Sequence, residues 1–240
     1  MPIPILTYHQ IDSPPPQGSP FRSLVVAPAS FARQMALLKL LGYQGLSMSA
    51  LLPYLRGEKT GKVVGMTFDD GYVNNLVHAL PVLQKHGFSA TCYMVSGQLG
   101  GSNVWDHALG IAPRPLMNGE QLRQWVAGGQ EVGSHTCNHV DLSVASAATG
   151  GKQIVDSQKD LQHLLGVSVQ HFCYPYGRFL ATHARQVQHA GYHTATTTQR
   201  GRALPTDSLF SLPRVPVLRA TTLAMFWLKV ATGYEDRRRA

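Results

Sequence analysis

Short apolar runs alternate with segments of helical periodicity along almost the whole chain. The apolar runs favour strands, and they cover residues 3–9, 62–68, 90–95, 131–134, 171–174, 192–196 and 213–217. The helical segments space apolar side chains three and four positions apart, and most end at a glycine. They cover residues 30–41, 74–86, 120–127, 153–165, 180–190 and 221–230. This alternation predicts parallel strands joined by helical crossovers.

The number of strands decides between the two common parallel architectures. About seven or eight strands over 240 residues fit a closed (β/α) barrel better than an open, doubly wound sheet. No G-x-G-x-x-G follows the first predicted strand, which disfavours dinucleotide binding. We therefore predict one α/β domain over residues 1–240, in which residues 218–240 form a C-terminal helix and a basic tail.

Composition narrows the class of protein further. The 44% of hydrophobic residues and the 14% of charged residues argue against disorder. No apolar run approaches the ~18 residues of a membrane span, so no transmembrane segment is expected. The three cysteines include no C-x-x-C pair, which disfavours a disulfide framework or a Cys-based zinc site. The formal charge is +8, but the basic residues are scattered, so nucleic acid is not an expected partner.

Both ends of the chain bear on its location. The first residues lack the basic and apolar regions of a signal peptide. A mature chain trimmed of its signal would look the same, so the cytoplasm, or the periphery of the inner membrane, is only the favoured location. Residues 223–227 predict a helix that packs on the barrel rather than into a membrane. The run from Arg237 to Arg239 favours a solvated tail over contact with anionic lipid or phosphate.

Titratable residues collect where the predicted strands end, and function in a parallel barrel lies at those ends. These residues are His9, Asp69, Asp70, His135 with His139 four positions later, and the run Tyr174–Pro175–Tyr176–Gly177. An H-x-x-x-H pair is common by itself, and Asp-Asp-Gly after a strand is usually a turn. Together, two histidines on one helical face and one carboxylate make a metal site with open positions. The second carboxylate is then free to act as a base.

Three motifs resemble those of the polysaccharide deacetylases, the NodB-homology domain of carbohydrate esterase family 4. They are Thr67-Phe68-Asp69-Asp70-Gly71, His135-Thr136-Cys137-Asn138-His139 and Phe172-Cys173-Tyr174-Pro175-Tyr176-Gly177. The resemblance extends from about Pro2 to Val217 and implies a distorted (β/α)7 barrel of the NodB-homology type.

The resemblance also implies roles for the residues of the site. Asp70, His135 and His139 would hold a divalent metal, with zinc expected and cobalt, nickel, iron or manganese also compatible. Asp69 would be the general base. Cys137, between the two histidines, is not expected to be a ligand.

The third motif and a nearby loop would shape the substrate groove. The backbone N–H of Tyr176 would stabilise the oxyanion, and its ring would line the sugar site together with Pro175. Trp105 either stacks on a sugar ring or anchors its loop.

Two departures from the common family pattern concern the catalytic acid and an arginine. The common family pattern places the acid in a Leu-x-His near the C-terminus, but no histidine follows His193. Residues 6–11 instead resemble the opening of the poly-N-acetylglucosamine deacetylase branch, and this resemblance implies that His9 is the acid. His193 is the second choice, and the alternative is that His9 is a structural histidine at a strand end. Many relatives carry an arginine at the position of Cys173, where it orients the catalytic Asp. Arg214 either supplies that charge from a neighbouring strand or is a simple surface or tether residue.

These features predict a metal-dependent hydrolase that removes N-acetyl groups from amino sugars of a cell-surface polysaccharide or its precursor. Two alternatives remain. The same metal site could hydrolyse a non-glycan amide such as a cyclic imide, or the chain could be a degenerate module that binds glycan without turnover. The presence of Asp69, Asp70, His135 and His139 argues against the degenerate module.

Overall fold

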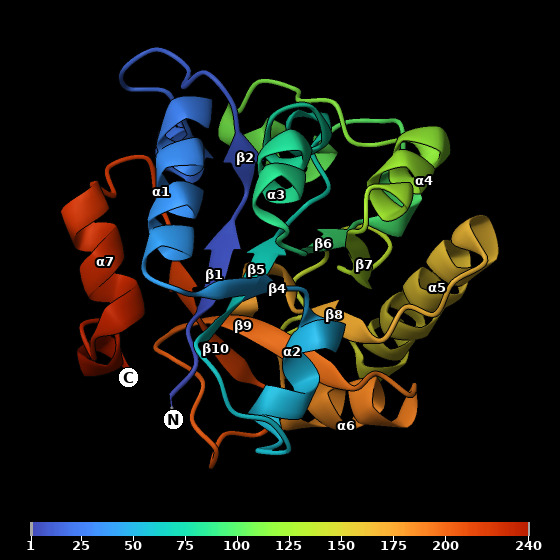
Figure 1. Ribbon diagram of the computed structural model, residues 1–240. Helices are drawn as coiled ribbons and strands as arrows, with labels where there is room; N and C mark the ends of the chain where they lie inside the picture. The colour runs from blue at the N-terminus through green and yellow to red at the C-terminus, as the bar shows by residue number, and fades with distance from the viewer. Residues whose placement is uncertain (1, 240) are drawn as a thin grey trace.

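A computed structural model describes residues 2–239 and confirms a seven-stranded parallel α/β barrel (Figure 1). The hydrogen-bonded order is β1-β10-β9-β8-β7-β6-β5, and β5 pairs back onto β1. The barrel strands are β1 (Ile5–Tyr8), β5 (Val63–Phe68), β6 (Thr91–Met94), β7 (Glu131–Ser134), β8 (His171–Cys173), β9 (Thr194–Arg200) and β10 (Leu212–Pro216). The other strands are β2 (Gln10–Ile11), β3 (Val25–Val26) and β4 (Gln44–Leu46).

The barrel is irregular around its circumference. β1 lies between β5 and β10, with Leu6 opposite both Met66 and Val215. β4 pairs with the first half of β5, and β6 pairs with the second half. The register between β9 and β10 shifts between Leu212 and Arg214. The circle is therefore closed but distorted.

Helices surround the strands and bury apolar faces against them (Figure 1). They are α1 (Pro28–Leu40), α2 (Met48–Leu55), α3 (Leu80–His86), α4 (Gly119–Ala127), α5 (Ala147–Leu165), α6 (Ala181–His189) and α7 (Leu223–Ala231). Phe226 and Val230 of α7 lie in the core, which confirms that this helix packs on the barrel. Among residues 2–239, no helix is long and apolar enough to cross a bilayer.

Sequence patterns missed the short strands β2, β3 and β4 and the short helix α2, and they misplaced some boundaries. β4 has three residues, and its Gly45 packs so closely on Phe88 that a Cβ would lie 2.7 Å from the ring. α2 has eight residues and contains Pro53, so helical periodicity is hard to detect. The helix predicted over residues 74–86 is a π-helical turn followed by α3, with Pro81 in its first turn.

The C-terminal tail is held by ion pairs more than its composition suggested. Glu235 is fully buried between Arg200 and Lys229, and Arg200 Nε donates to its carboxylate at 2.7 Å. Arg239 pairs with Asp207, so the expectation of a solvated tail is wrong for this residue. The two preceding arginines are exposed. The tail contributes Glu235, a buried acidic partner for Arg200 and Lys229, which a run of arginines does not reveal.

We expect Glu235→Gln to destabilise the fold. Removing one partner of a buried ion pair leaves the other charge unpaired and costs about 3–5 kcal/mol. The matched control is Glu58→Gln, since Glu58 is exposed and pairs with Arg56 at 4.0 Å. A surface pair of that kind contributes about 0–1 kcal/mol. Urea unfolding at neutral pH measures both variants, and equal free energies of unfolding would contradict the expectation.

The same unfolding experiment in acid tests whether the ionised form of Glu235 is the one that stabilises the fold. Burial alone would raise the pKa of Glu235, but hydrogen bonds and charges from Arg200 and Lys229 hold that pKa below its ordinary value. Stability from such a group is present at neutral pH and is lost as the pH falls through the lowered pKa. The difference between the native chain and Glu235→Gln should therefore shrink in acid.

Candidate metal centre

A cavity of about 130 Å³ opens at the carboxyl ends of the barrel strands. Seven of the residues predicted for the site line it, namely His9, Asp69, Asp70, Trp105, His135, His139 and Tyr176. They come from the segments after β1, β5, β6, β7 and β8. The fold thus brings together residues that are far apart along the chain.

Asp70, His135 and His139 converge inside this cavity, and all three are buried. Asp70 Oδ1 lies 3.5 Å from His135 Nε2 and 3.4 Å from His139 Nε2. The three potential ligand atoms lie within 4.8 Å of one another. One carboxylate oxygen and two imidazole nitrogens at this separation can reach a common divalent cation.

The histidines do not share a helical face, so that part of the prediction is wrong. β7 ends at Ser134, and residues 135–139 form a turn. Thr136 has φ 67° and His139 has φ 54°, both in the left-handed region. The chain reverses within the motif, and this turn directs both rings toward Asp70.

Left-handed backbone is concentrated around the cavity. Within residues 2–239, the non-glycine residues with positive φ are Phe21, Asp70, Thr136, His139 and Tyr176. All of them line the cavity except Thr136, which follows His135 directly. Such conformations cost about 1–3 kcal/mol each and persist where the surrounding structure imposes them. The turn after β5 also needs Gly71, because a Cβ there would lie 2.2 Å from Met94.

A hydrogen bond behind the ring suits His135 to metal binding. His135 Nδ1 lies 2.7 Å from the Cys173 carbonyl oxygen, which can only accept, so this nitrogen carries the proton. The Nε2 lone pair of His135 then faces Asp70, the usual arrangement of a ligating histidine. Cys137 contacts the carbonyl of Gln153 at 3.7 Å and lies outside the ligand group. The residues present therefore fit a divalent cation.

Asp69 lines the same cavity beside this cluster and forms a buried ion pair with Arg214. Arg214 Nη1 donates to Asp69 Oδ1 and Nη2 donates to Oδ2, each at 2.7 Å. Arg214 Nε donates to the Thr197 carbonyl at 2.9 Å, and Nη1 also reaches the Thr67 hydroxyl at 3.1 Å. Nη2 lies 3.2 Å from Cys173 Sγ. Arg214 is therefore a buried partner of the candidate base and not a surface residue.

Both carboxylates are held in the charged form. Burial raises the pKa of Asp69, but the charge and hydrogen bonds of Arg214 outweigh it and lower the pKa below its usual value. Burial likewise opposes ionisation of Asp70, whose pKa is held well below the ordinary range by hydrogen bonds with His135 and His139. An ionised Asp69 can accept a proton at neutral pH.

The two candidate acids lie at opposite ends of the barrel. His9 follows β1, lines the cavity, and its Nε2 lies 3.9 Å from Asp69 Oδ2. Its carbonyl accepts a hydrogen bond from Asn75 Nδ2 at 2.8 Å, which fixes the backbone there. His193 precedes β9 at the amino end, with its ring 6.2 Å from that of His171. The geometry supports His9 over His193.

Aromatic rings enclose His139. Trp105 stacks on it with centroids 4.4 Å apart, and Tyr176 meets it edge-on at 4.6 Å. One face of Trp105 is thus already in contact with a candidate ligand. Tyr176 is partly exposed and lines the cavity, whereas Pro175 is buried and does not. The structure therefore places Pro175 behind the groove surface.

Tyr72 and Asp106 are among the cavity residues that were not singled out from the sequence. Tyr72 and Asp106 are both buried at the cavity wall, and Asn103 Nδ2 donates to Asp106 Oδ2 at 3.0 Å. Tyr72 directly follows the Asp-Asp-Gly turn, so its position was a usable signal. Asp106 lies in a 3-10 helix (Val104–Leu109) in a long loop, and only the folded chain brings it to the site.

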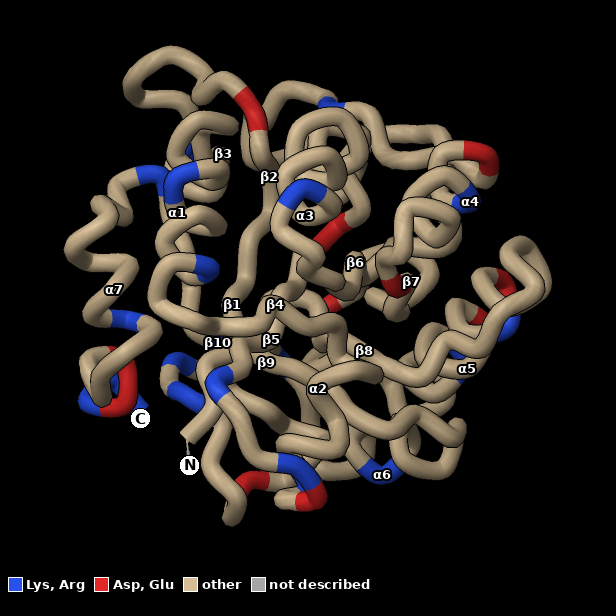
Figure 2. The backbone as a smooth tube through the Cα atoms, viewed as in Figure 1, with Lys and Arg blue, Asp and Glu red and all other residues tan. Residues whose placement is uncertain are grey.

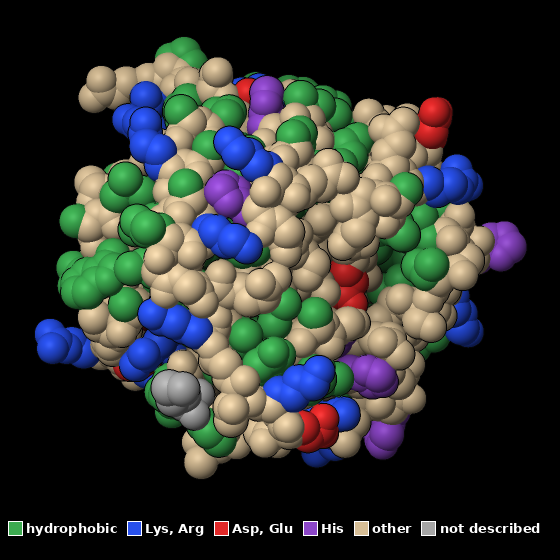
Figure 3. All heavy atoms as spheres, viewed as in Figure 1, with side chains coloured by type: hydrophobic (Ala, Val, Ile, Leu, Met, Phe, Trp, Pro, Cys, Tyr) green, Lys and Arg blue, Asp and Glu red, His purple; other side chains and the backbone are tan. Residues whose placement is uncertain are grey.

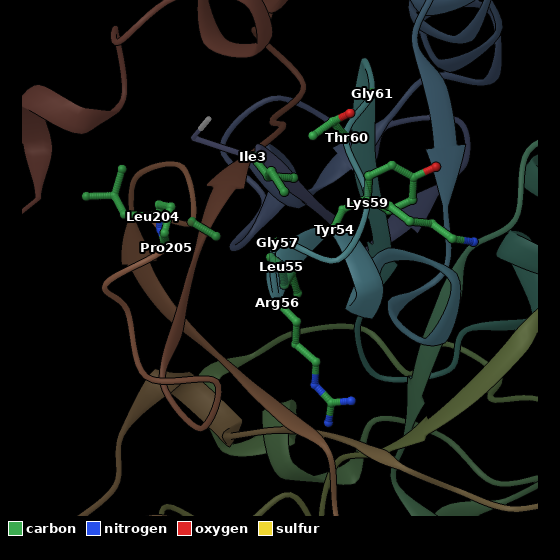
Figure 4. Close-up of a pocket in the computed structure, with 11 residues that line it drawn as sticks. Ile3, Tyr54, Leu55, Arg56, Gly57, Lys59, Thr60, Gly61, Leu204 and Pro205 are labelled. Carbon is green, nitrogen blue, oxygen red and sulfur yellow. The ribbon is translucent and has the colours of Figure 1, made fainter.

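A second cavity, of about 170 Å³, lies at the amino end of the barrel (Figure 4). Its wall combines Ile3, Leu204 and Pro205 with the segment that follows α2. In Figure 4 the Arg56 side chain extends away from Ile3 and Leu204. Among the described residues, the side chains that could share a metal ion all lie outside this cavity. This cavity is therefore not the candidate metal centre.

A family model for polysaccharide deacetylases matches residues 56–195. The chain belongs to the polysaccharide deacetylase family. Within this family, Bacillus subtilis YxkH, whose name marks it as a candidate polysaccharide deacetylase, is 30% identical over 217 residues, or 90% of this chain and 71% of YxkH. The Staphylococcus aureus poly-beta-1,6-N-acetyl-D-glucosamine N-deacetylase is 25% identical over 199 residues, or 79% of this chain and 67% of that protein.

A solved family structure has the same fold. The Streptococcus pyogenes deacetylase PplD, in complex with acetate, superimposes with a TM-score of 0.84 at 28% identity. The match covers 96% of this chain and 98% of PplD. It confirms the NodB-type barrel expected from the three motifs.

Metal binding at Asp70, His135 and His139 predicts a ligand-dependent gain in stability. Adding zinc to the metal-stripped chain should raise its Tm, because a ligand at 100 times its Kd stabilises the folded state by about 2.7 kcal/mol. His139→Ala should abolish this rise and lower the bound zinc measured by elemental analysis.

The matched control is His107→Ala, since His107 is exposed and close to the site in sequence. This variant should bind zinc like the native chain. An undiminished Tm rise in His139→Ala would contradict the ligand assignment.

Proposed function

We propose that this protein is a metal-dependent hydrolase that removes N-acetyl groups from amino sugars of a cell-surface polysaccharide or its precursor. One observation carries the proposal. An ionised carboxylate, Asp69, is fixed by Arg214 beside the cluster of Asp70, His135 and His139 in a single cavity. Amide hydrolysis needs a base close to an electrophilic centre.

The chain's own residues account for the proton transfers. A divalent cation, with zinc as our expected metal, would supply Lewis acidity toward water and the acetyl carbonyl. Asp69 accepts the proton of the attacking water, and Arg214 keeps its carboxylate ionised and oriented. As the C–N bond breaks, His9 protonates the departing amine, so acetate and a free amino sugar result. The backbone N–H of Tyr176 is our candidate donor to the oxyanion.

The shape of the site favours a substrate longer than one sugar. Two further cavities, of about 280 and 230 Å³, adjoin the central one. The first shares Gln10, Phe21 and Ile111 with it, and the second shares His9 and Leu24. Continuous walls of this kind form an elongated groove that suits a glycan chain. A cyclic imide would occupy only the central part, so we place that alternative second.

The relatives support the same chemistry. Acetate, found in the PplD structure, is the product that N-deacetylation releases. The Staphylococcus aureus relative is named for removing acetyl groups from a polymer of N-acetylglucosamine. The third alternative, glycan binding without turnover, fits poorly with an Asp69 that is both ionised and oriented.

Asp69→Asn should retain bound metal and lose acetate release from N-acetylglucosamine oligomers by about 10²–10⁴-fold, because an amide cannot accept the proton. Acetate release and metal content are measured on the same sample. The control, Asp156→Asn, makes the same chemical change at a surface pair with Lys152 and should leave both unchanged. Full activity in Asp69→Asn would refute the base assignment.

His9→Ala should separate substrates by their leaving groups. Hydrolysis of the sugar amide needs a protonated amine and should fall by about 10²-fold or more. An activated aryl acetate ester leaves without a proton and should be affected far less, whereas Asp69→Asn should impair both. His107→Ala is the control, and equal losses on amide and ester would argue against His9 as the acid.

A further inference from the structure

The outer face of α7 is apolar. Leu223 and Trp227 are 41% and 44% exposed, and they lie one helical turn apart on a side that includes Ala224 and Ala231. Met225 is also exposed. Exposed apolar side chains gathered on one helix mark an interaction surface more often than scattered single ones do. Figure 3 shows this hydrophobic cluster over α7, at the left of the view.

The single charged residue of α7 points inward instead of toward water. Lys229 is buried, its Nζ donates to the Pro216 carbonyl at 2.9 Å, and it pairs with Glu235. A surface helix ordinarily places its charges outside and its apolar residues inside. Here both sides of α7 are apolar, and Phe226 and Val230 already fill the inner side. The outer side chains therefore contribute nothing to the core.

Unpaired cations surround this apolar face. Arg219 lies in the loop that enters α7, Arg237 and Arg238 follow the helix, and Arg33 lies on the adjacent α1; all four are exposed. The nearby acids, Glu235 and Asp236, are occupied by ion pairs. Figure 2 shows basic segments on α1, in the loop into α7 and after it.

We infer that α7 docks on an anionic lipid surface. Leucine, methionine and tryptophan side chains enter the interfacial region of a bilayer, and flanking arginines attract anionic headgroups. A second copy of the chain fits less well, because a twofold interface places the same patch on both partners. The unpaired arginines of two copies would then face each other without acidic partners.

The segment that leads into α7 lies close to the candidate metal centre. The segment between β10 and α7 runs past the cavity, where Val217 N donates to the Thr7 carbonyl and Arg219 N to the Ser23 carbonyl at 2.8 Å. Leu218, in the same segment, lines a cavity together with His9. A docked α7 would hold the mouth of the groove next to the lipid. The docking itself does not depend on the proposed function.

Co-sedimentation with vesicles tests the inference directly. The full chain should bind phosphatidylcholine vesicles that contain phosphatidylglycerol, bind pure phosphatidylcholine weakly, and lose affinity as salt increases. Leu223→Ser combined with Trp227→Ser should lower the affinity at least about tenfold. Arg219→Gln should lower it about fivefold.

A matched pair of substitutions controls for lost hydrophobicity. Leu40→Ser combined with Val144→Ser removes two apolar side chains outside α7 that are each 83% exposed. This variant should bind vesicles like the native chain. All variants should keep their Tm and their acetate release from soluble oligomers, so a failed docking test is distinguishable from a failed enzyme assignment.

Tryptophan fluorescence gives a second measurement that needs no destabilising change. Emission from the native chain should shift to the blue on anionic vesicles, and Trp227→Phe should remove the shift, because Trp125 is already buried and Trp105 is stacked on His139. Equal binding to neutral and anionic vesicles, or no binding to either, would overturn the inference. A dimer that Trp227→Ser converts to monomers would instead identify a second copy as the occupant.

Discussion

The buried ion pair between Arg214 and Asp69 is the interaction on which the rest of the site depends. Arg214 comes from β10 and Asp69 follows β5, and β1 lies between these two strands. The pair therefore spans the place where the barrel closes. Its desolvation cost is offset by two parallel hydrogen bonds and by the contact with the Thr197 carbonyl. A carboxylate held in this way keeps one orientation toward the cavity.

Cys173 shows how the barrel accommodates this arrangement. The resemblance to the family motif led us to expect an arginine at the Cys173 position, whereas here the guanidinium that pairs with the candidate base arrives from β10 and touches the Cys173 thiol. A small side chain on β8 leaves room for it. The carbonyl of the same residue orients His135. One residue thus contacts both the partner of the base and a candidate metal ligand, so the base and the ligands are positioned against a common support.

The sequence was sufficient for the barrel and for the residues gathered in the cavity, because strand periodicity and short motifs report on both. It could not show how the backbone presents them. His135 and His139 meet at Asp70 through a left-handed turn, and five letters of sequence fit a helix equally well. The positions of residues in long loops could not be predicted either. Trp105 lies outside the three motifs, and only tertiary packing brings it onto His139. Arg214 was in between, since its pairing with the candidate base was one of two alternatives, and the sequence could not choose between that pairing and a surface position.

The closure of the barrel across β1 has a consequence for how the protein is made. Asp70, His135 and His139 all emerge from the ribosome before residue 140, together with the strands that carry them. Arg214 belongs to the last strand, and the ring of hydrogen bonds is complete only when β10 reaches β1. A nascent chain could gather its candidate metal ligands well before its base is oriented. The order of synthesis therefore separates the gathering of the candidate metal ligands from the pairing of Asp69 with Arg214, which forms only as the final strand folds.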